Sequence, residues 1–253
     1  MVDVFEEVED QIRTERYRSV AIKALPWVLG VAAAALIAAL AFWGWDTYSK
    51  AQADKASETF MAALEANSQG DQAGAFARFG EVAKSNARGY RGLALMAQGG
   101  MRMEAGKADE AVKLWDEAAK ASSDPVLGDL ARLKSALALL DTASYKELEG
   151  RLTPLMEDKR PYRLQAREAL AFAKIMAGKP GEAKSDFTYL SQVLGASDGQ
   201  RRRAQAALAL IDSGSASAIP AAVKAAALLP PPPPQMPEGL MGPGGPQAQG
   251  TPQ

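Results

Sequence analysis

The chemistry open to this sequence is that of carboxylates and lysines, because its 253 residues include no histidine and no cysteine. Their absence excludes Ser-His-Asp and Cys-His nucleophile arrangements and the common zinc and haem ligand sets. The acidic residues show no motif of recognisable spacing, and the glycines form no phosphate-binding loop. We therefore expect no catalytic, cofactor-binding or metal-binding residues, and a protein that is not an enzyme.

The charges give no sign of nucleic-acid binding. The chain has 29 basic and 30 acidic residues, a formal net charge of −1. The densest basic cluster, Arg201-Arg202-Arg203, fits within one helical turn and is typical of a solvated helix face. We expect protein partners and a membrane, and no nucleic acid.

The longest uncharged stretch, Ala24–Trp45, lies near the N-terminus between Lys23 and Asp46. A helix needs about 20 apolar residues, at about 1.5 Å rise per residue, to cross the hydrocarbon core of a bilayer. Aromatic side chains mark both ends of the stretch, as they do at membrane–water interfaces. We therefore predict a single transmembrane helix over residues 24–45. Its aromatic anchor residues are Trp27, Trp43, Trp45 and Tyr48.

A cleaved signal peptide is the alternative, because Ala51-Gln52-Ala53 has the small-x-small form of a cleavage site. Two features favour an uncleaved anchor. The stretch exceeds the usual apolar region of about 7–15 residues, and six acidic residues precede it.

The basic residues on either side of the stretch predict its orientation. Four lie just before it, at residues 13–23, and only Lys50 and Lys55 lie close behind it. The positive-inside rule then places residues 1–23 in the cytoplasm. We expect a single-pass protein whose C-terminal domain is exported; in a bacterium this means the inner membrane, with the domain in the periplasm. The lack of cysteine fits that compartment without proving it.

Glycine turns recur beyond the span at a period of about 36 residues. Gly70-Asp71, Gly106-Lys107 and Gly178-Lys179 lie 36 and then 72 residues apart, and Asp141-Thr142 fills the missing position. A small residue precedes each turn, and an Ala-x-x-x-aromatic pair follows each glycine turn, so that antiparallel helices can approach closely. The small residues are Ala63, Gly99, Ala136 and Ala171, and the pairs are Ala75/Phe79, Ala111/Trp115 and Ala183/Phe187, with Leu148 and Leu152 in the third unit.

This pattern predicts an all-α fold: one transmembrane helix, then a tetratricopeptide-like helical-repeat domain over residues 46–213 with about four helical pairs and a cap. A generic alanine-rich helical bundle is the alternative. Residues 214–253 are rich in alanine, proline and glycine, and we expect them to form a mostly disordered tail. The expected helices are 46–67 and 72–86, 90–105 and 109–121, 126–140 and 145–156, 161–176 and 182–194, with the cap at 199–211.

Stacked helical pairs curve, and the first helix of each pair lines the hollow. Flexible methionine side chains suit the recognition of varied apolar segments. The same six positions could instead all be core residues, and both interpretations stay open here. The candidate partner-binding residues are Phe60, Leu64, Met96, Met103, Leu133 and Phe172.

A charged N-terminus containing Glu6-Glu7-Val8-Glu9, one early span and an exported domain of about four helical pairs resembles the bacterial YfgM family over about Val4 to Ile211. The resemblance implies an inner-membrane protein with a periplasmic tetratricopeptide-like domain. It further implies an ancillary subunit of the SecYEG translocon that partners a PpiD-like chaperone. No functional residue is carried over from the family. An envelope scaffold for cell-wall or outer-membrane assembly complexes is the alternative function.

Overall fold

The computed structural model describes residues 3–226 and 228, with side chains from residue 25 onward. Every regular element in this part of the chain is a helix, as the sequence predicts. The α-helices are α1 (Asp3–Ser68), α2 (Gln72–Ala83), α3 (Arg88–Glu104), α4 (Ala108–Ala121), α5 (Pro125–Ala138), α6 (Tyr145–Leu152), α7 (Arg163–Met176), α8 (Pro180–Gln192), α9 (Asp198–Asp212) and α10 (Ile219–Ala226), and the 3₁₀ helices are η1 (Thr153–Met156) and η2 (Ser215–Ala218).

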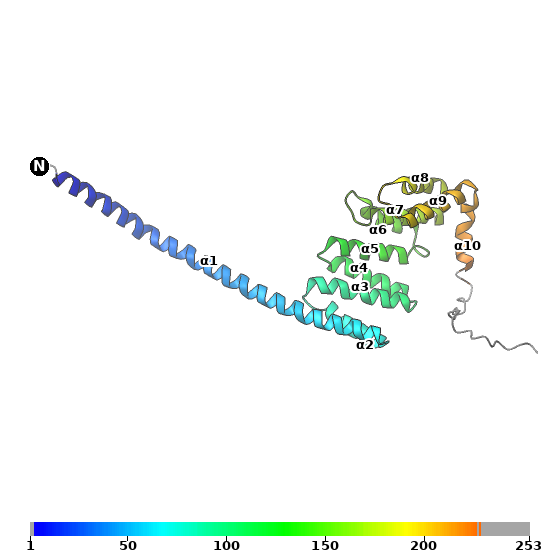
Figure 1. Ribbon diagram of the computed structural model, residues 1–253, viewed down its shortest axis with the longest axis horizontal. Coiled ribbons are helices and arrows are strands. Elements are labelled where there is room, and N and C mark those ends of the chain that lie inside the picture. Colours follow the sequence, from blue (N-terminus) through cyan, green and yellow to red (C-terminus); the bar gives the residue numbers. More distant parts are fainter. Residues whose placement is uncertain (1–2, 227, 229–253) are drawn as a thin grey trace, which may run out of the picture. The chain divides into compact units, whose positions relative to one another are not determined.

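Helix α1 is far longer than any other described element and combines two chemically different parts (Figure 1). Its most apolar stretch begins at Leu25, has a mean hydropathy of 2.3 and is not buried by the rest of the chain. Its C-terminal part carries the buried residues Ala56, Ala63 and Ala66. The apolar part has the length and composition of a membrane span, although a signal sequence would pass the same test.

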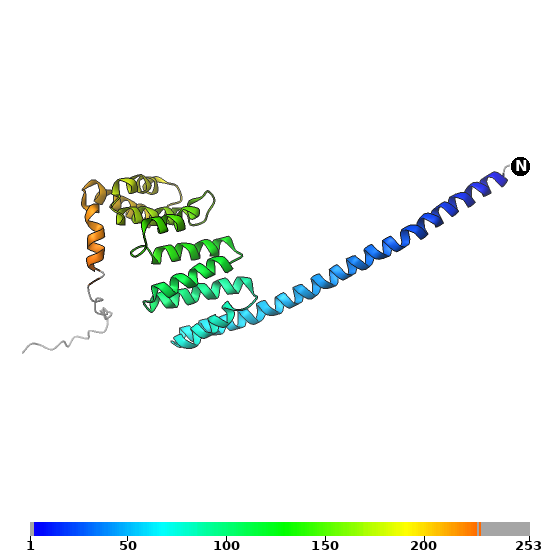
Figure 2. The same cartoon turned by 180° about the vertical axis from the view of Figure 1, so that it is seen from behind.

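The chain forms two compact units that divide after Leu170, within α7. In the first unit, consecutive helices pack as antiparallel neighbours: α1 against α2, α2 against α3, and onward to α6 (Figures 1 and 2). In addition, α1 contacts α3, and α3 contacts α5. The first helices of successive pairs therefore form one layer, and the second helices pack on it.

The predicted glycine turns are present and share one geometry. Gly70, Gly106 and Gly178 have φ values of +85°, +72° and +73°, which are accessible to glycine at little cost. After each glycine, the next backbone N–H donates to a carbonyl five residues earlier at 2.9 Å, as in a Schellman motif. Between α5 and α6, Ala143 N–H instead donates to Leu139 O at 2.8 Å, and no glycine is needed.

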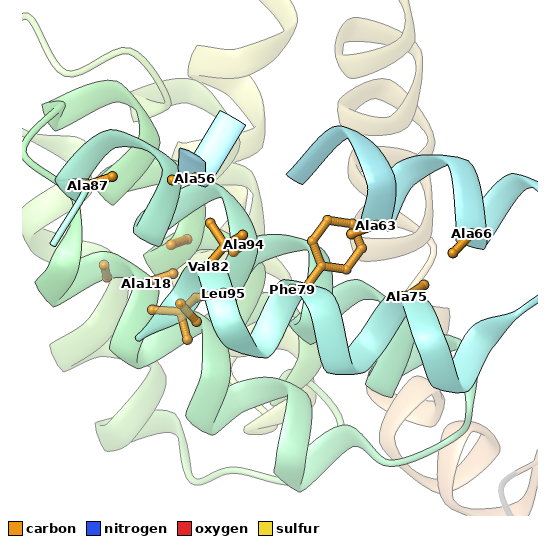
Figure 3. Close-up of a cluster of buried hydrophobic side chains, with 13 residues drawn as sticks. Ala56, Ala63, Ala66, Ala75, Phe79, Val82, Ala87, Ala94, Leu95 and Ala118 are labelled. Carbon is orange, nitrogen blue, oxygen red and sulfur yellow. The ribbon is translucent and has the colours of Figure 1, made fainter. Parts of the chain in front are cut away.

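The small residues and their aromatic partners form the core of the pairs. Ala63 and Ala75 are fully buried, and Phe79 is 2 % exposed beside them (Figure 3). The Phe79 ring meets Phe60 edge-on, with centroids 5.2 Å apart, an arrangement that aromatic pairs favour. In the second pair Gly99 takes the place of the small residue and Trp115 that of the aromatic. The helical-repeat phase is therefore confirmed at these positions.

The second helix of the third pair is shorter than the predicted range 145–156. Helix α6 ends at Leu152, and residues 153–156 form the 3₁₀ helix η1 instead. Pro154 explains the change, because it has no N–H to donate into a continuing α-helix. The predicted first repeat helix, 46–67, is the end of α1, which continues into it without a break. The remaining predicted helix ends differ by no more than three residues from the structure.

The second unit contains the end of α7 and all of α8, α9, η2 and α10. Phe172 and Phe187 meet edge-on at 5.1 Å, and Lys174 Nζ lies 2.7 Å from Asp186 Oδ2. The capping helix α9 packs against α8. Helices η2 and α10 occupy the start of the predicted tail; residue 227 and residues 229–253 lie outside the described residues. Residues 198–212 and 215–226 would together be apolar enough for a span but are bent by 95°.

Candidate interaction surface

In the repeats of the first unit, the large exposed apolar side chains share one layer of helices. Within residues 56–170, all of which the structure describes, they lie on α1, α3 and α5 and none lies on α2, α4 or α6. Each is at least 40 % exposed. We call this set the apolar face. Its members are Met61, Leu64, Leu93, Met103, Val126 and Leu137.

The apolar face follows the helical repeat. On α3, Leu93, Met96, Gly100 and Met103 recur at steps of three or four residues, so they lie on one side of the helix. It adjoins the buried side, which carries Leu95, Gln98 and Gly99 among others. A second stripe on α5 contains the exposed Val126 and Leu137 and the half-buried Leu130. Leu133 falls at the same spacing but is buried in the core. The first helices therefore present parallel apolar stripes.

A shallow groove joins two of these stripes. It encloses about 290 Å³, and its lining is mostly apolar. Leu93 of α3 and Val126 and Leu130 of α5 contribute to it, together with Tyr162 ahead of α7. Arg88, the first residue of α3, also lines it. The groove has room for one or two apolar side chains of a partner.

The six predicted partner-binding residues divide between surface and core. Leu64 and Met103 are exposed by 41 % and 43 % and belong to the apolar face. Phe60 and Met96 are half-buried and pack against the core of the first two pairs. Leu133 is 5 % exposed, so it is a core residue. Phe172 is half-buried against Phe187.

Four members of the apolar face were not among the predicted residues: Met61, Leu93, Val126 and Leu137. Their signal in the sequence is the spacing of three and four residues along each first helix. That spacing is hard to recognise in the sequence, because alanine occupies both core and surface positions in this chain. The predicted membrane anchors Trp27, Trp43, Trp45 and Tyr48 are all more than half exposed, and their role as anchors stays a prediction.

Charged side chains of the first unit form hydrogen bonds and ion pairs within and between its helices. Arg151 Nη1 donates to both carboxylate oxygens of Asp116 at 2.9 and 3.0 Å and to Ser135 Oγ at 3.0 Å. These contacts join α4, α5 and α6. Asp129, whose side chain is 1 % exposed, receives Arg132 at 3.1 Å and Arg160 at 3.2 Å. Such bonds satisfy buried polar groups and hold helices in register.

No group of three or more His, Cys, Asp or Glu residues that could hold a metal ion occurs among the described residues. The acidic side chains detailed above are held by arginines and a serine within the fold.

The comparisons with known proteins bear on the fold directly. The family of tetratricopeptide repeat-like domains matches residues 25–206, well over half of the chain. The match begins within the apolar stretch of α1 and ends in the capping helix α9. The comparisons with curated proteins and with solved structures found no match. Domains of this kind are generally protein-interaction modules. This chain belongs to the tetratricopeptide repeat-like domain family.

Proposed function

We propose that this protein is a membrane-anchored adaptor that binds protein partners through the apolar face. The observation that carries the proposal is that, within residues 56–170, the large exposed apolar side chains all lie on α1, α3 and α5. Exposed apolar surface costs free energy in water and gathers where a partner covers it. A random distribution would place some of these residues on α2, α4 or α6.

The anchor in this proposal is the apolar part of α1. It leaves Trp27, Trp43 and Trp45 at least 66 % exposed, which lipid headgroups would favour and water would not. The family match includes this stretch together with the repeats. Four basic residues ahead of it favour a cytoplasmic N-terminus and an exported repeat domain.

The resemblance to the YfgM family supports a finer proposal. In it the protein resides in the bacterial inner membrane, and its periplasmic domain associates with the SecYEG translocon and a PpiD-like chaperone. Apolar segments leaving a translocon need transient cover, which an apolar face held nearby can give or recruit. The protein acts by binding, without catalysis or cofactor. The alternative is an envelope scaffold for cell-wall or outer-membrane assembly.

Purification of the tagged full-length chain from membranes dissolved in mild detergent tests the proposal. The wild type is compared with the double variant Leu93→Gln/Leu137→Gln, which makes two stripes of the apolar face polar. Both side chains are at least 40 % exposed, so the fold should tolerate the change. Lys113→Gln on α4 is the control, since it alters an exposed residue of the opposite layer.

We expect translocon subunits or a periplasmic chaperone to accompany the wild type and the Lys113→Gln control. The double variant should recover at least tenfold less of them. Recovery of cell-wall or outer-membrane assembly proteins alone would replace the translocon proposal with the scaffold. Equal recovery by all three chains would show that the apolar face is not the binding surface. Alkaline extraction of the membranes tests the anchor, because a spanning helix stays in the pellet.

A further inference from the structure

The segment between the apolar stretch and the repeats is itself helical. Residues 46–55, which we call the stalk, lie inside α1 and contain no glycine or proline. The first buried residue after it is Ala56, which packs in the core of the first two pairs. Pro26 lies well ahead of the stalk. No break therefore separates the proposed anchor from the first repeat helix.

Side-chain contacts along the stalk favour the helix. Lys50 Nζ donates to Asp46 Oδ2 at 2.6 Å, with the acid four residues ahead of the base, the better order on a helix. This hydrogen bond and the charge of Asp46 raise the pKa of Lys50. Gln52 Nε2 donates to Tyr48 Oη at 3.3 Å, and Thr47 Oγ1 to Trp43 O at 2.9 Å.

The helix is favoured at both ends of the stalk as well. An isolated helix of ten residues is marginal in water, because its first turn must nucleate and its ends fray. The stalk need not nucleate its own first turn, and its ends cannot fray, because helix continues on both sides of it. On one side the packed residues Ala56, Ala63 and Ala66 hold the helix against α2 and α3. On the other side a lipid-embedded stretch must keep its backbone hydrogen bonds satisfied internally, which also enforces helix.

We infer that the stalk is a rigid strut that fixes the height and rotational setting of the apolar face relative to the membrane. This inference rests on the proposed anchoring of α1. At about 1.5 Å per residue, Met61 and Leu64 stand about 24 and 28 Å beyond Trp45 along the helix axis. A partner must therefore present its binding surface at that height, which a protein confined to the headgroup region does not reach.

Distance measurement between two spin labels tests the strut. The full-length chain lacks cysteine, so Ser49→Cys and Asn67→Cys give two defined labels. Both positions are exposed, and they lie 18 residues, or five turns, apart on the same side of α1. The chain is reconstituted in vesicles of phosphatidylethanolamine and phosphatidylglycerol. A rigid stalk gives one narrow distance distribution near about 27 Å.

Two controls make the result specific. Insertion of Gly-Ser-Gly-Ser after Ala53 should broaden the distribution at least twofold. The pair Asn67→Cys/Ser123→Cys lies wholly within the first unit, at exposed positions, and its distribution should be the same with and without the insertion. A change at that pair would instead place the motion in the repeats and overturn the inference.

A broad distribution of distances between the labels at residues 49 and 67, in the chain without the insertion, would overturn the inference of a rigid stalk. Flotation of the same sample with the vesicles keeps this outcome separate from anchoring. A chain that floats and gives a broad distribution refutes the strut alone. A chain that fails to float refutes the anchor, and the inference about height falls with it.

Discussion

Replacing either of two adjacent glycines of α3 with alanine should change the stability of the fold, but in opposite directions. A Cβ atom built on Gly99 would lie 2.5 Å from Cδ1 of Trp115 and closer still to its Nε1, whereas one built on Gly100 meets nothing within 4 Å. Trp115 has little freedom to move away. It is 4 % exposed, its Nε1 donates to Met96 O at 3.2 Å, and Lys134 Nζ lies 5.5 Å from the ring centroid.

The expected magnitudes follow from these contacts. Alanine in place of glycine within a helix gains about 0.8–1 kcal/mol of helix propensity, and this gain is common to both sites. Overpacking a close-packed core costs about 1–3 kcal/mol, and only Gly99→Ala incurs that cost. Gly100→Ala should therefore stabilise the fold. The free energy of unfolding of Gly99→Ala should be about 1–3 kcal/mol lower than that of Gly100→Ala, because both variants share the same gain in helix propensity.

Thermal unfolding of the full chain in detergent, followed by circular dichroism, measures the difference. Each kcal/mol corresponds to about 2–4 °C in Tm for a chain of this size. Replacing Trp115 with leucine should remove most of the Gly99→Ala penalty, because the ring that the new methyl group meets is gone. Equal Tm values for Gly99→Ala and Gly100→Ala would refute the proposed contact between the helices of the second pair.

Two further pairs of variants test the turns and the polar contacts by the same unfolding measurement. Gly106→Ala should cost about 1–2 kcal/mol, because φ there is +72°; Gly150→Ala, in a helix with open space around it, should gain about 0.5–1 kcal/mol. Higher stability of both variants than of the wild type would contradict the turn geometry. Arg160→Ala should cost about 1–3 kcal/mol by stripping a partner from buried Asp129, while Arg163→Ala, whose partner Asp158 is 95 % exposed, should stay within about 0.5 kcal/mol. An equal loss of stability in Arg160→Ala and Arg163→Ala would show that the ion pair between Arg160 and Asp129 does not stabilise the fold.

The parts of the fold that the sequence predicts are those with a local cause. Gly70, Gly106 and Gly178 each close a turn that needs a positive φ, so their spacing reveals the repeat directly. The Ala-x-x-x-aromatic pairs are equally local, because residues four apart share one helix face. The end of α6 also had a local signal in Pro154, which the predicted range 145–156 overlooked.

The orientation of each first helix is less accessible from the sequence. Phe60 and Met61 differ by one position, yet only Met61 is strongly exposed; Leu133 is buried, while Leu137, one turn later, is exposed. Alanines fill both sides of these helices, so hydrophobic periodicity alone leaves the phase ambiguous. The burial of Asp129 could not be predicted either, because its partner Arg160 lies 31 residues away.

Site-specific photo-crosslinking in intact cells tests the central claim, that the apolar face binds a protein partner, most directly. A photoreactive residue replaces Leu93 or Leu137 on the apolar face, or Lys113 on the exposed surface of α4. We expect probes at Leu93 and Leu137 to capture the same protein partner, and the probe at Lys113 to capture at least tenfold less of it. The same adducts in equal yield from all three positions, or adducts from Lys113 alone, would contradict the claim.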